Sequence, residues 1–261
     1  MMNALLPVSI VIPCRDAAAT LARTLESCIR EPQVTEILVV DDASTDDSPD
    51  IVRRYQQRDA RIVSLRMPVQ GGSARARNWG VLHASQPLIA FIDADDEYLP
   101  GALAAASRYL ADHPDDASIR LDVEFAGFPP EIVTHPEFAR LAATLSNTVP
   151  SSLVIRRPVF LAIGGFPMDG FFRRHGGYDG AFSWALSRVF GNPRLVDATR
   201  VRMHNHARSH AARFFRINLN METPDPADVL EAVRLSRQFV ATVEANIAQL
   251  HATSKLVARS T

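Results

Sequence analysis

The sequence predicts an α/β protein with a mostly parallel central sheet flanked by helices. Short runs rich in β-branched residues alternate with segments of helical periodicity throughout residues 1–112. Two of these runs end in clustered aspartates, which is typical of strands whose carboxyl ends carry function. A regular β-α alternation favours right-handed crossovers, and these place helices on both faces of one sheet.

Four strands and four helices are predicted in the first 112 residues. The strand segments share a compact apolar run bounded by turn residues, and they are 8–12, closed by Pro13, then 36–40, 61–65 and 88–92. The helical segments share apolar residues spaced three or four apart, and they are 17–30, 48–58, 74–84 and 100–112.

The regular alternation stops after residue 112. Strands are predicted over 119–128 and 151–157, and helices over 136–146, 158–163 and 178–190. A tail helix over 226–251 carries an apolar stripe, which must pack on the body of the protein or on a partner. Dimerisation through this helix is therefore one hypothesis.

The composition excludes several classes of function. A net charge of −1 over 261 residues gives no reason to expect nucleic-acid binding. Lys255 is the only lysine, so a Schiff-base or P-loop lysine within the body of the domain is excluded. Cys14 and Cys28 are too few for a disulfide framework or a four-cysteine zinc site. Without a signal peptide or an apolar run of about 18 residues, a cytoplasmic protein is expected.

Two groups of carboxylates carry the clearest chemical signal. Asp41 and Asp42 follow the predicted strand 36–40, and an acidic run at 93–97 follows strand 88–92. Carboxyl ends of parallel strands meet at one edge of a sheet, so these groups are expected to lie close together. Like charges gathered in this way are costly unless they are solvated or paired with a cation. Either the acidic run is a solvated turn that caps the next helix, or a divalent cation binds there.

Five segments occur in the order seen in family 2 glycosyltransferases of the GT-A fold. They are VSIVIPCRDAAATLARTLESC, ILVVDDASTDDS, GGSARARNWG, FIDADD and IGGF. Each segment alone is weakly specific, but the ordered set is strong, and the chain resembles this family over roughly residues 8–210. The resemblance implies a Rossmann-like nucleotide-sugar-binding half at 1–112, an acceptor-binding half at 113–221 and a C-terminal helical tail at 222–261.

The resemblance also implies a set of residues that bind the donor. Asp93-Ala94-Asp95 matches the family's DxD motif, in which Asp95 would contact Mg²⁺ or Mn²⁺ most directly. Asp42 would accept a hydrogen bond from the base, usually uracil, although its chemistry also suits guanine. Arg77 would contact phosphate or sugar hydroxyls. The alternative is a simple salt bridge to the acidic residues at the edge of the sheet. The full expected donor set is Pro13, Arg15, Asp41, Asp42, Ser44, Arg77, Asn78, Asp93 and Ala94.

The acceptor half matches the family only in part. Gly164-Gly165-Phe166 corresponds to the family's GGF segment. Where the family has Glu-Asp-x-Asp, this chain has Tyr178-Asp179-Gly180-Ala181, so Asp179 is the expected catalytic base and Asp169 its nearest rival. A helix-capping role for Asp179 remains an alternative. His206 matches a family histidine that contacts metal or diphosphate, while a surface or capping role fits the sequence equally well.

The resulting hypothesis is an inverting, divalent-metal-dependent glycosyltransferase that uses a nucleotide sugar, most often UDP-linked, in cell-envelope polysaccharide biosynthesis. Its acceptor hydroxyl is not specified by the sequence.

A basic segment containing Arg200, Arg202, Arg208 and Arg213 would close over the diphosphate or contact anionic lipid at the inner face of the membrane. Two alternatives are a nucleotide-sugar-binding protein without catalysis, suggested by Tyr178 and Ala181, and a receiver-type signalling domain. The receiver domain is disfavoured because it needs a lysine after its fifth strand.

Overall fold

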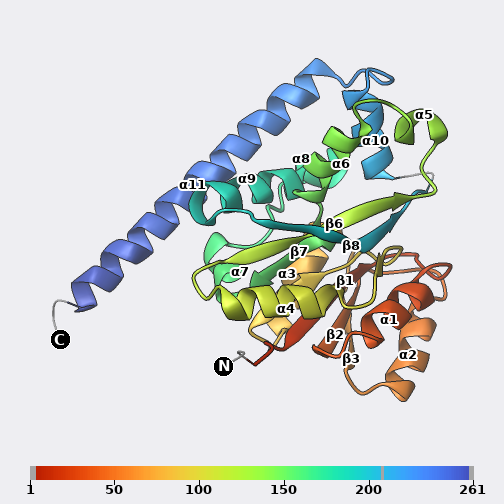
Figure 1. Cartoon of the computed structure of the whole chain (residues 1–261), viewed down its shortest axis with the longest axis horizontal. Coiled ribbons are helices and arrows are strands. Elements are labelled where there is room, and N and C mark those ends of the chain that lie inside the picture. The colour runs from red at the N-terminus through yellow and green to blue at the C-terminus, as the bar shows by residue number, and fades with distance from the viewer. Residues whose placement is uncertain (1–3, 207–208, 259–261) are drawn as a thin grey trace.

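One mixed sheet organises the protein. The computed structural model describes residues 4–206 and 209–258, and within them eight strands follow the order β3-β2-β1-β4-β7-β6-β8-β5. Helices cover both faces of this sheet (Figure 1). The predicted α/β class with helices on two faces is therefore confirmed.

The first four strands form the predicted parallel half. They are β1 (Val8–Cys14), β2 (Val34–Asp41), β3 (Ile62–Arg66) and β4 (Leu88–Phe91). Pro13 does not close the first strand as expected but lies inside β1, opposite Val40. Cys14 is aligned with Asp41, and Asp41 with Arg66, so the carboxyl ends of three neighbouring strands share one edge.

Four helices alternate with these strands. They are α1 (Leu21–Ile29), α2 (Ser48–Arg58), α3 (Ser73–His83) and α4 (Ala102–Asp112). Helix α1 begins later than predicted because the preceding residues form a turn against the loop after β2. In that turn the Ala17 N–H donates to Ser48 Oγ (2.9 Å) and the Ala18 N–H to Asp46 Oδ2 (2.9 Å). Helix α4 is capped from outside, since buried Glu31 accepts from the N–H groups of Gly101 and Leu103.

The second half adds antiparallel pairing. Its strands are β6 (Ser118–Ala126), β7 (Leu153–Arg156) and β8 (Arg194–His204), and β8 also pairs antiparallel with the short β5 (Glu97–Tyr98), which precedes α4. Strand β7 runs antiparallel to β4 and β6, whereas β8 runs parallel to β6. The helical segments are α5 (Pro130–Val133), α6 (Phe138–Ser146), the 3₁₀ turn η1 (Pro150–Ser152), α7 (Arg157–Ile163), α8 (Gly170–His175), α9 (Tyr178–Phe190) and α10 (His210–Asn218).

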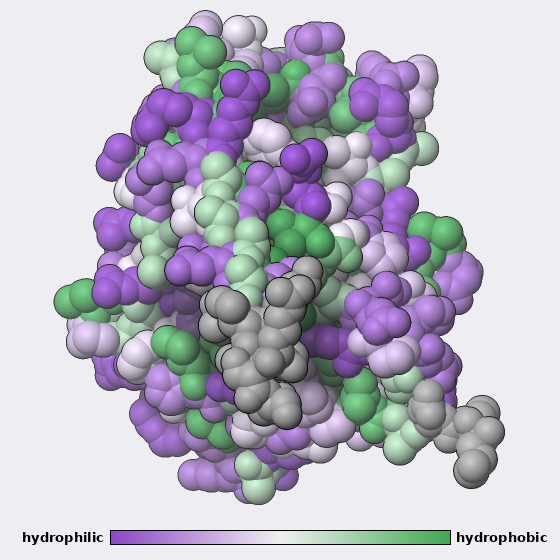
Figure 2. All heavy atoms as spheres, turned by 90° about the vertical axis from the view of Figure 1, so that its left-hand side faces the viewer, coloured by the Kyte–Doolittle hydropathy of each residue, from purple (hydrophilic) through white to green (hydrophobic). Residues whose placement is uncertain are grey.

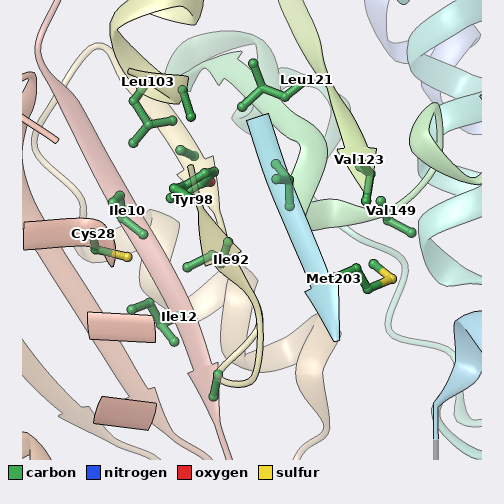
Figure 3. Close-up of a cluster of buried hydrophobic side chains, with 14 of the residues drawn as sticks. Ile10, Ile12, Cys28, Ile92, Tyr98, Leu103, Leu121, Val123, Val149 and Met203 are labelled. Carbon is green, nitrogen blue, oxygen red and sulfur yellow. The ribbon is translucent and has the colours of Figure 1, made fainter. Parts of the chain in front are cut away.

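The hydrophobic core lies on both faces of the sheet. Helices α1, α2, α4, α6 and α10 contribute to a cluster on one face, and α3, α7, α9 and α11 to a cluster on the other. Figure 3 shows the first cluster, in which Ile10 of β1 lies near Ile92 and Tyr98, while Met203 of β8 lies further along the cluster, near Val123 and Val149. Apolar side chains from both halves of the chain therefore share one core. Cys14 and Cys28 are both buried as free thiols, and burial raises the pKa of each to about 12.

The tail helix α11 (Pro226–Ala258) runs along one side of the molecule (Figure 1). Val240, Val243 and Ile247 are buried in the cluster that α9 and α7 form, so part of the predicted stripe packs on the body. Arg188 of α9 pairs with Glu244 at 3.0 Å. Figure 2 views this side of the protein and shows mainly hydrophilic residues with small apolar groups between them. Among the described helices, α11 included, none combines the length and apolar character that crossing a membrane requires.

Candidate functional site

A cavity of about 1230 Å³ opens at the carboxyl ends of β1, β2 and β4. The opposite wall is formed by α8, the first turn of α9 and the segment that joins β8 to α10, and the N-terminal part of α11 closes one side. This volume exceeds the roughly 300–1,000 Å³ of a typical small-molecule pocket. The cavity therefore has room for two reactants side by side.

Asp42 holds a glycine turn at one end of the cavity. Its carboxylate accepts from the N–H groups of Gly71 (2.6 Å) and Gly72 (2.8 Å), and Arg15 Nη1 donates to the Asp42 carbonyl oxygen (2.7 Å). Asp42, Arg15 and Pro13 all line the cavity. Each carboxylate oxygen accepts one backbone hydrogen bond and retains capacity for a second.

Asp41 and Ser44 are placed differently from the expectation, because neither lines the cavity. Asp41 Oδ1 accepts from the Ser44 N–H (2.9 Å), and Ser44 Oγ accepts from the Asp16 N–H (3.1 Å). These bonds join the loop after β2 to the loop after β1. Both residues therefore support the loops that border the cavity without lining it.

Asn78 also lies outside the cavity lining, in contrast to the expectation. Its amide pairs with the backbone of Phe166 in both directions, donating to the carbonyl oxygen and accepting from the N–H, each at 2.8 Å. This double hydrogen bond joins α3 to the Gly164-Gly165-Phe166 turn. The asparagine thus positions this glycine turn.

Replacing Gly165 by alanine should weaken this junction. Gly165 has φ of +75°, and a Cβ there would lie 2.6 Å from Asn78 Oδ1. We expect Gly165→Ala to lower the free energy of unfolding by more than the ~1–2 kcal/mol of left-handed strain alone. Gly164→Ala is the matched control, because Gly164 has φ of +91° and open space where the added methyl group would lie. Urea denaturation measures both, and equal losses in the two variants would contradict the role of Asn78.

The aspartate loop after β4 presents two carboxylates to the cavity. Asp93 forms an ion pair with Arg77, and Asp95 Oδ2 lies 3.2 Å from His206 Nε2. Ala94 lines the cavity between them. Asp96 has a different role, since its buried carboxylate accepts from Ser151 Oγ (3.0 Å) and from the His204 N–H (3.1 Å). The acidic run is therefore not a solvated turn.

The electrostatics at Asp95 suit a divalent cation. Burial raises the pKa of Asp95, and the neighbouring Asp93 raises it further, against the opposing charges of His206 and Arg23. Across the described residues, no group of three or more His, Cys, Asp and Glu side chains forms a complete metal cage. Mg²⁺ and Mn²⁺ at phosphate sites commonly use one or two carboxylates and take further ligands from the phosphates. One carboxylate with an adjacent imidazole fits that chemistry.

Arg77 is a buried cation between the two walls of the cavity. Its side chain donates to Asp93 and to the Tyr178 hydroxyl, and its guanidinium lies 5.8 Å from the ring centre of Phe166. Burial opposes the charge, but Asp93, Tyr178 and Asp179 outweigh that effect and raise the pKa of Arg77. The salt bridge considered from sequence is thus present, and the arginine also lines the cavity.

Asp179 lies across the cavity in the first turn of α9 and is half-buried. Burial raises the pKa of its carboxyl group, while backbone N–H groups, Arg77 and His210 act in the opposite direction. Asp169, its rival, is the N-cap of α8 and accepts from the Phe171 N–H at 2.7 Å. Both carboxylates therefore accept backbone N–H groups at a helix start, and the role of Asp179 as the base stays a prediction.

The basic segment near β8 is largely neutralised within the protein. Arg200 pairs with Asp197, and Arg202 pairs with Glu124. Arg213 pairs with Glu222 at 2.8 Å. Arg208 lies outside the described residues. Contact with anionic lipid therefore remains a prediction.

Two residues of the site were not expected from the sequence. Ser151 bonds to the aspartate loop, and Arg120 of β6 lies buried next to α9. The alternating pattern of the predicted strand 119–128 places Arg120 among its solvent-facing polar residues, so the sequence carried no local signal for its burial.

Comparisons with known proteins agree with this architecture. Over 96 residues the chain is 40% identical to the succinoglycan biosynthesis protein ExoU of Rhizobium meliloti, and the match covers 37% of this chain and 28% of ExoU. Over 104 residues it is 36% identical to the UDP-Glc:alpha-D-GlcNAc-diphosphoundecaprenol beta-1,3-glucosyltransferase WfaP of Escherichia coli, and that match covers 40% of this chain and 41% of WfaP. The chain thus matches less than half the length of either relative.

Solved structures share the fold at low sequence identity. S. aureus TarS 1–349 in complex with UDP-GlcNAc superimposes with a TM-score of 0.66 and 16% identity, over 94% of this chain and 71% of TarS 1–349. The mannosyltransferase PcManGT from Pyrobaculum calidifontis, in complex with GDP-Man and Mn²⁺, gives a TM-score of 0.62 and 19% identity, over 98% of this chain and 80% of PcManGT. The sequence profile of Glycosyl transferase family 2 matches residues 9–145, which is more than half of the chain. The chain therefore belongs to glycosyl transferase family 2.

Proposed function

We propose that the protein is an inverting glycosyltransferase that moves a sugar from a nucleotide-diphosphate donor, most often UDP-linked, to an acceptor hydroxyl. One observation carries the proposal. Asp42 and Asp95, from the ends of two different strands, line the same cavity as Asp179, which approaches from the opposite wall. The arrangement separates a donor side from a base side, as transfer between two bound molecules requires.

The donor side supports binding of a nucleoside diphosphate. Asp42 and Arg15 lie at the end where the base would bind, and Arg77 supplies a buried positive charge near the middle of the cavity. WfaP is named for a UDP-Glc donor, while TarS and PcManGT were solved with UDP-GlcNAc and GDP-Man. A role in cell-envelope polysaccharide synthesis is suggested by ExoU, which is named for succinoglycan biosynthesis.

Asp95 and His206 are the proposed ligands of Mg²⁺ or Mn²⁺. When bound there, the cation would neutralise the diphosphate and make it a better leaving group. The base side then requires a proton acceptor. Asp179 takes the proton from the acceptor hydroxyl, and that oxygen forms a bond to the anomeric carbon on the face opposite the diphosphate. The bond from that carbon to the phosphate oxygen breaks, and its electron pair leaves with the diphosphate.

Nucleotide binding gives the most direct test. Thermal unfolding is measured with UDP, GDP and CDP, each with and without Mn²⁺, and is followed by turnover of the matching nucleotide sugars. We expect one nucleotide with Mn²⁺ to stabilise the protein by about 2.7 kcal/mol at a hundredfold excess over its Kd. If no nucleoside diphosphate raises the Tm under either condition, the proposed function is wrong.

The pH dependence of turnover should reveal Asp179. Its pKa is raised above the ordinary 3.8, so it becomes protonated, and inactive as a base, at a higher pH than an ordinary aspartate. We expect kcat at saturating donor to fall on the acid side with an apparent pKa above 3.8. Donor affinity is measured over the same range, which separates protonation of Asp95 from protonation of Asp179. Asp169→Asn is the control and should leave the acid limb in place.

A further inference from the structure

A fully buried arginine without a carboxylate partner lies beneath the helix that carries Asp179. Arg120, in β6, is 0% exposed. Its guanidinium donates to four neutral acceptors: the Val149 carbonyl oxygen (2.8 Å), Ser152 Oγ (3.1 Å), Ser183 Oγ (2.6 Å) and Asn192 Oδ1 (3.0 Å). A buried charge is costly even when its hydrogen bonds are satisfied. Stability alone therefore does not explain why a charged residue occupies this position.

Three of the four acceptors of Arg120 belong to two segments next to the cavity, and the fourth, Asn192, follows the end of α9. Ser183 lies one turn after Asp179 on α9. Val149 precedes the η1 turn and lines the cavity wall, and Ser152 is the last residue of η1. Ser183 Oγ also donates to the Thr148 carbonyl oxygen at 3.2 Å. The guanidinium therefore fastens the beginning of α9 to the segment 148–152.

The same segment is fastened to the aspartate loop on the donor side. Ser151 Oγ accepts from the Asp93 N–H (3.2 Å) and donates to Asp96 Oδ2 (3.0 Å). The connected path runs from the aspartate loop through Ser151 and the η1 turn to Arg120, and from there through Ser183 to α9. Both the proposed metal side and the proposed base side are thus tied to one short turn.

The charge of Arg120 also acts on Asp179. Burial lowers the pKa of Arg120 to about 9, and Asp179 is the charge that opposes this lowering, so Arg120 remains cationic at neutral pH. The other charged or titratable groups that act on this region of α9 are Arg77 from α3, Asp93 from the aspartate loop, His210 from α10 and the adjacent Tyr178. The Arg188–Glu244 pair lies at the far end of α9.

We propose that Arg120 is a positioning residue for the transfer reaction. Its guanidinium fixes the distance between the Asp93–Asp96 loop and the first turn of α9, and it places a positive charge beneath Asp179. The inference rests on the proposed role of Asp179 as the base. It predicts that Arg120 affects the base and kcat, while donor binding is left intact.

Three variants test the proposal. Arg120→Met removes the charge and the hydrogen bonds, and Arg120→Lys keeps the charge but loses the forked geometry. Arg156→Met is the matched control, because Arg156 likewise donates to neutral backbone oxygens, those of Asp116, Leu110 and His113, on a neighbouring strand. The carboxyl ¹³C resonance of Asp179, assigned by its loss in Asp179→Asn, is titrated in each protein. Steady-state kcat and donor KM are measured in parallel.

We expect Arg120→Met to raise the pKa of Asp179 and to lower kcat by about 10- to 100-fold, with little change in donor KM. Arg120→Lys should keep the pKa of Asp179 near that of the wild type and recover part of kcat. Arg156→Met should alter neither quantity. An Asp179 pKa that is the same in Arg120→Met and the wild type would overturn the proposal, and so would equal effects of Arg120→Met and Arg156→Met.

The outcomes also separate this inference from the proposed function. If the wild type transfers no sugar from any donor, the proposed function fails, but the titration of Asp179 still decides whether Arg120 acts on that group. If Arg120→Met does not fold, Ser183→Ala removes the 2.6 Å hydrogen bond at an otherwise helix-compatible position. Lower kcat with unchanged donor KM in Ser183→Ala supports the proposal, and unchanged kcat contradicts it.

Discussion

Asp179→Asn is expected to lower kcat by about 10²–10⁴-fold, the usual contribution of a general base. The amide has nearly the same shape as the carboxylate but cannot accept the proton of the acceptor hydroxyl. Donor binding should persist, because the donor side is built by residues of β1, the loop after β2, α3 and the aspartate loop. The measurement is kcat for transfer, together with the thermal shift that the nucleoside diphosphate produces.

Asp169→Asn provides the comparison for this prediction. Asp169 caps α8 at the same cavity, so its loss tests whether any nearby carboxylate would have the same effect. We expect α8 to persist, because asparagine caps a helix about as well as aspartate, and kcat to stay near that of the wild type. If Asp169→Asn were the more damaging change, Asp169 would replace Asp179 as the base.

Asp95→Ala should abolish the Mn²⁺-dependent part of nucleotide binding and most of the turnover. Asp95 faces the cavity beside His206, and the proposed cation has no other carboxylate in that position, since Asp93 is engaged by Arg77. Loss of charge neutralisation at a diphosphate leaving group costs several kcal/mol in the transition state. Calorimetric titration of the nucleoside diphosphate with and without Mn²⁺ measures the effect on binding.

Asp96 gives a contrasting control for Asp95. Its carboxylate is buried and bonded to Ser151 and to the backbone of β8, so Asp96→Ala should reduce the Tm. Asp95→Ala should leave the Tm of the nucleotide-free protein nearly unchanged or slightly higher, because it removes a repulsive carboxylate. Identical Mn²⁺ responses in wild type and Asp95→Ala would show that Asp95 does not bind the metal.

The first half of the fold was predictable because its signals are local. Helix α2 begins and ends at the predicted residues 48 and 58, and the four parallel strands lie within a few residues of their predicted positions. In the second half, β8 was missed because its first part, Arg194–Arg200, is mostly exposed and has no apolar alternation. The two-residue strand β5 exists only because β8 pairs with it, so no local pattern could have revealed it.

The candidate site was predictable as a set of carboxylates but not in its connections. The strand-end rule brought Asp42, Asp93 and Asp95 to one cavity. It could not distinguish residues that line the cavity from residues that support it from outside. Asn78 and Ser44 are supporting residues, and their role depends on which backbone groups need hydrogen-bond partners. Arg120 and Ser151 were missed for the same reason, since each acts through contacts between distant segments.

The protection of both native thiols has a practical consequence. Thiols with a pKa near 12 and almost no exposed surface react poorly with maleimides, so the wild-type chain should give little background labelling. A single cysteine introduced at an exposed position, such as Leu230 on α11 or Leu82 on α3, would then accept a fluorophore selectively. A doubly labelled chain would report by energy transfer whether α11 approaches the nucleotide-binding side when both reactants are present.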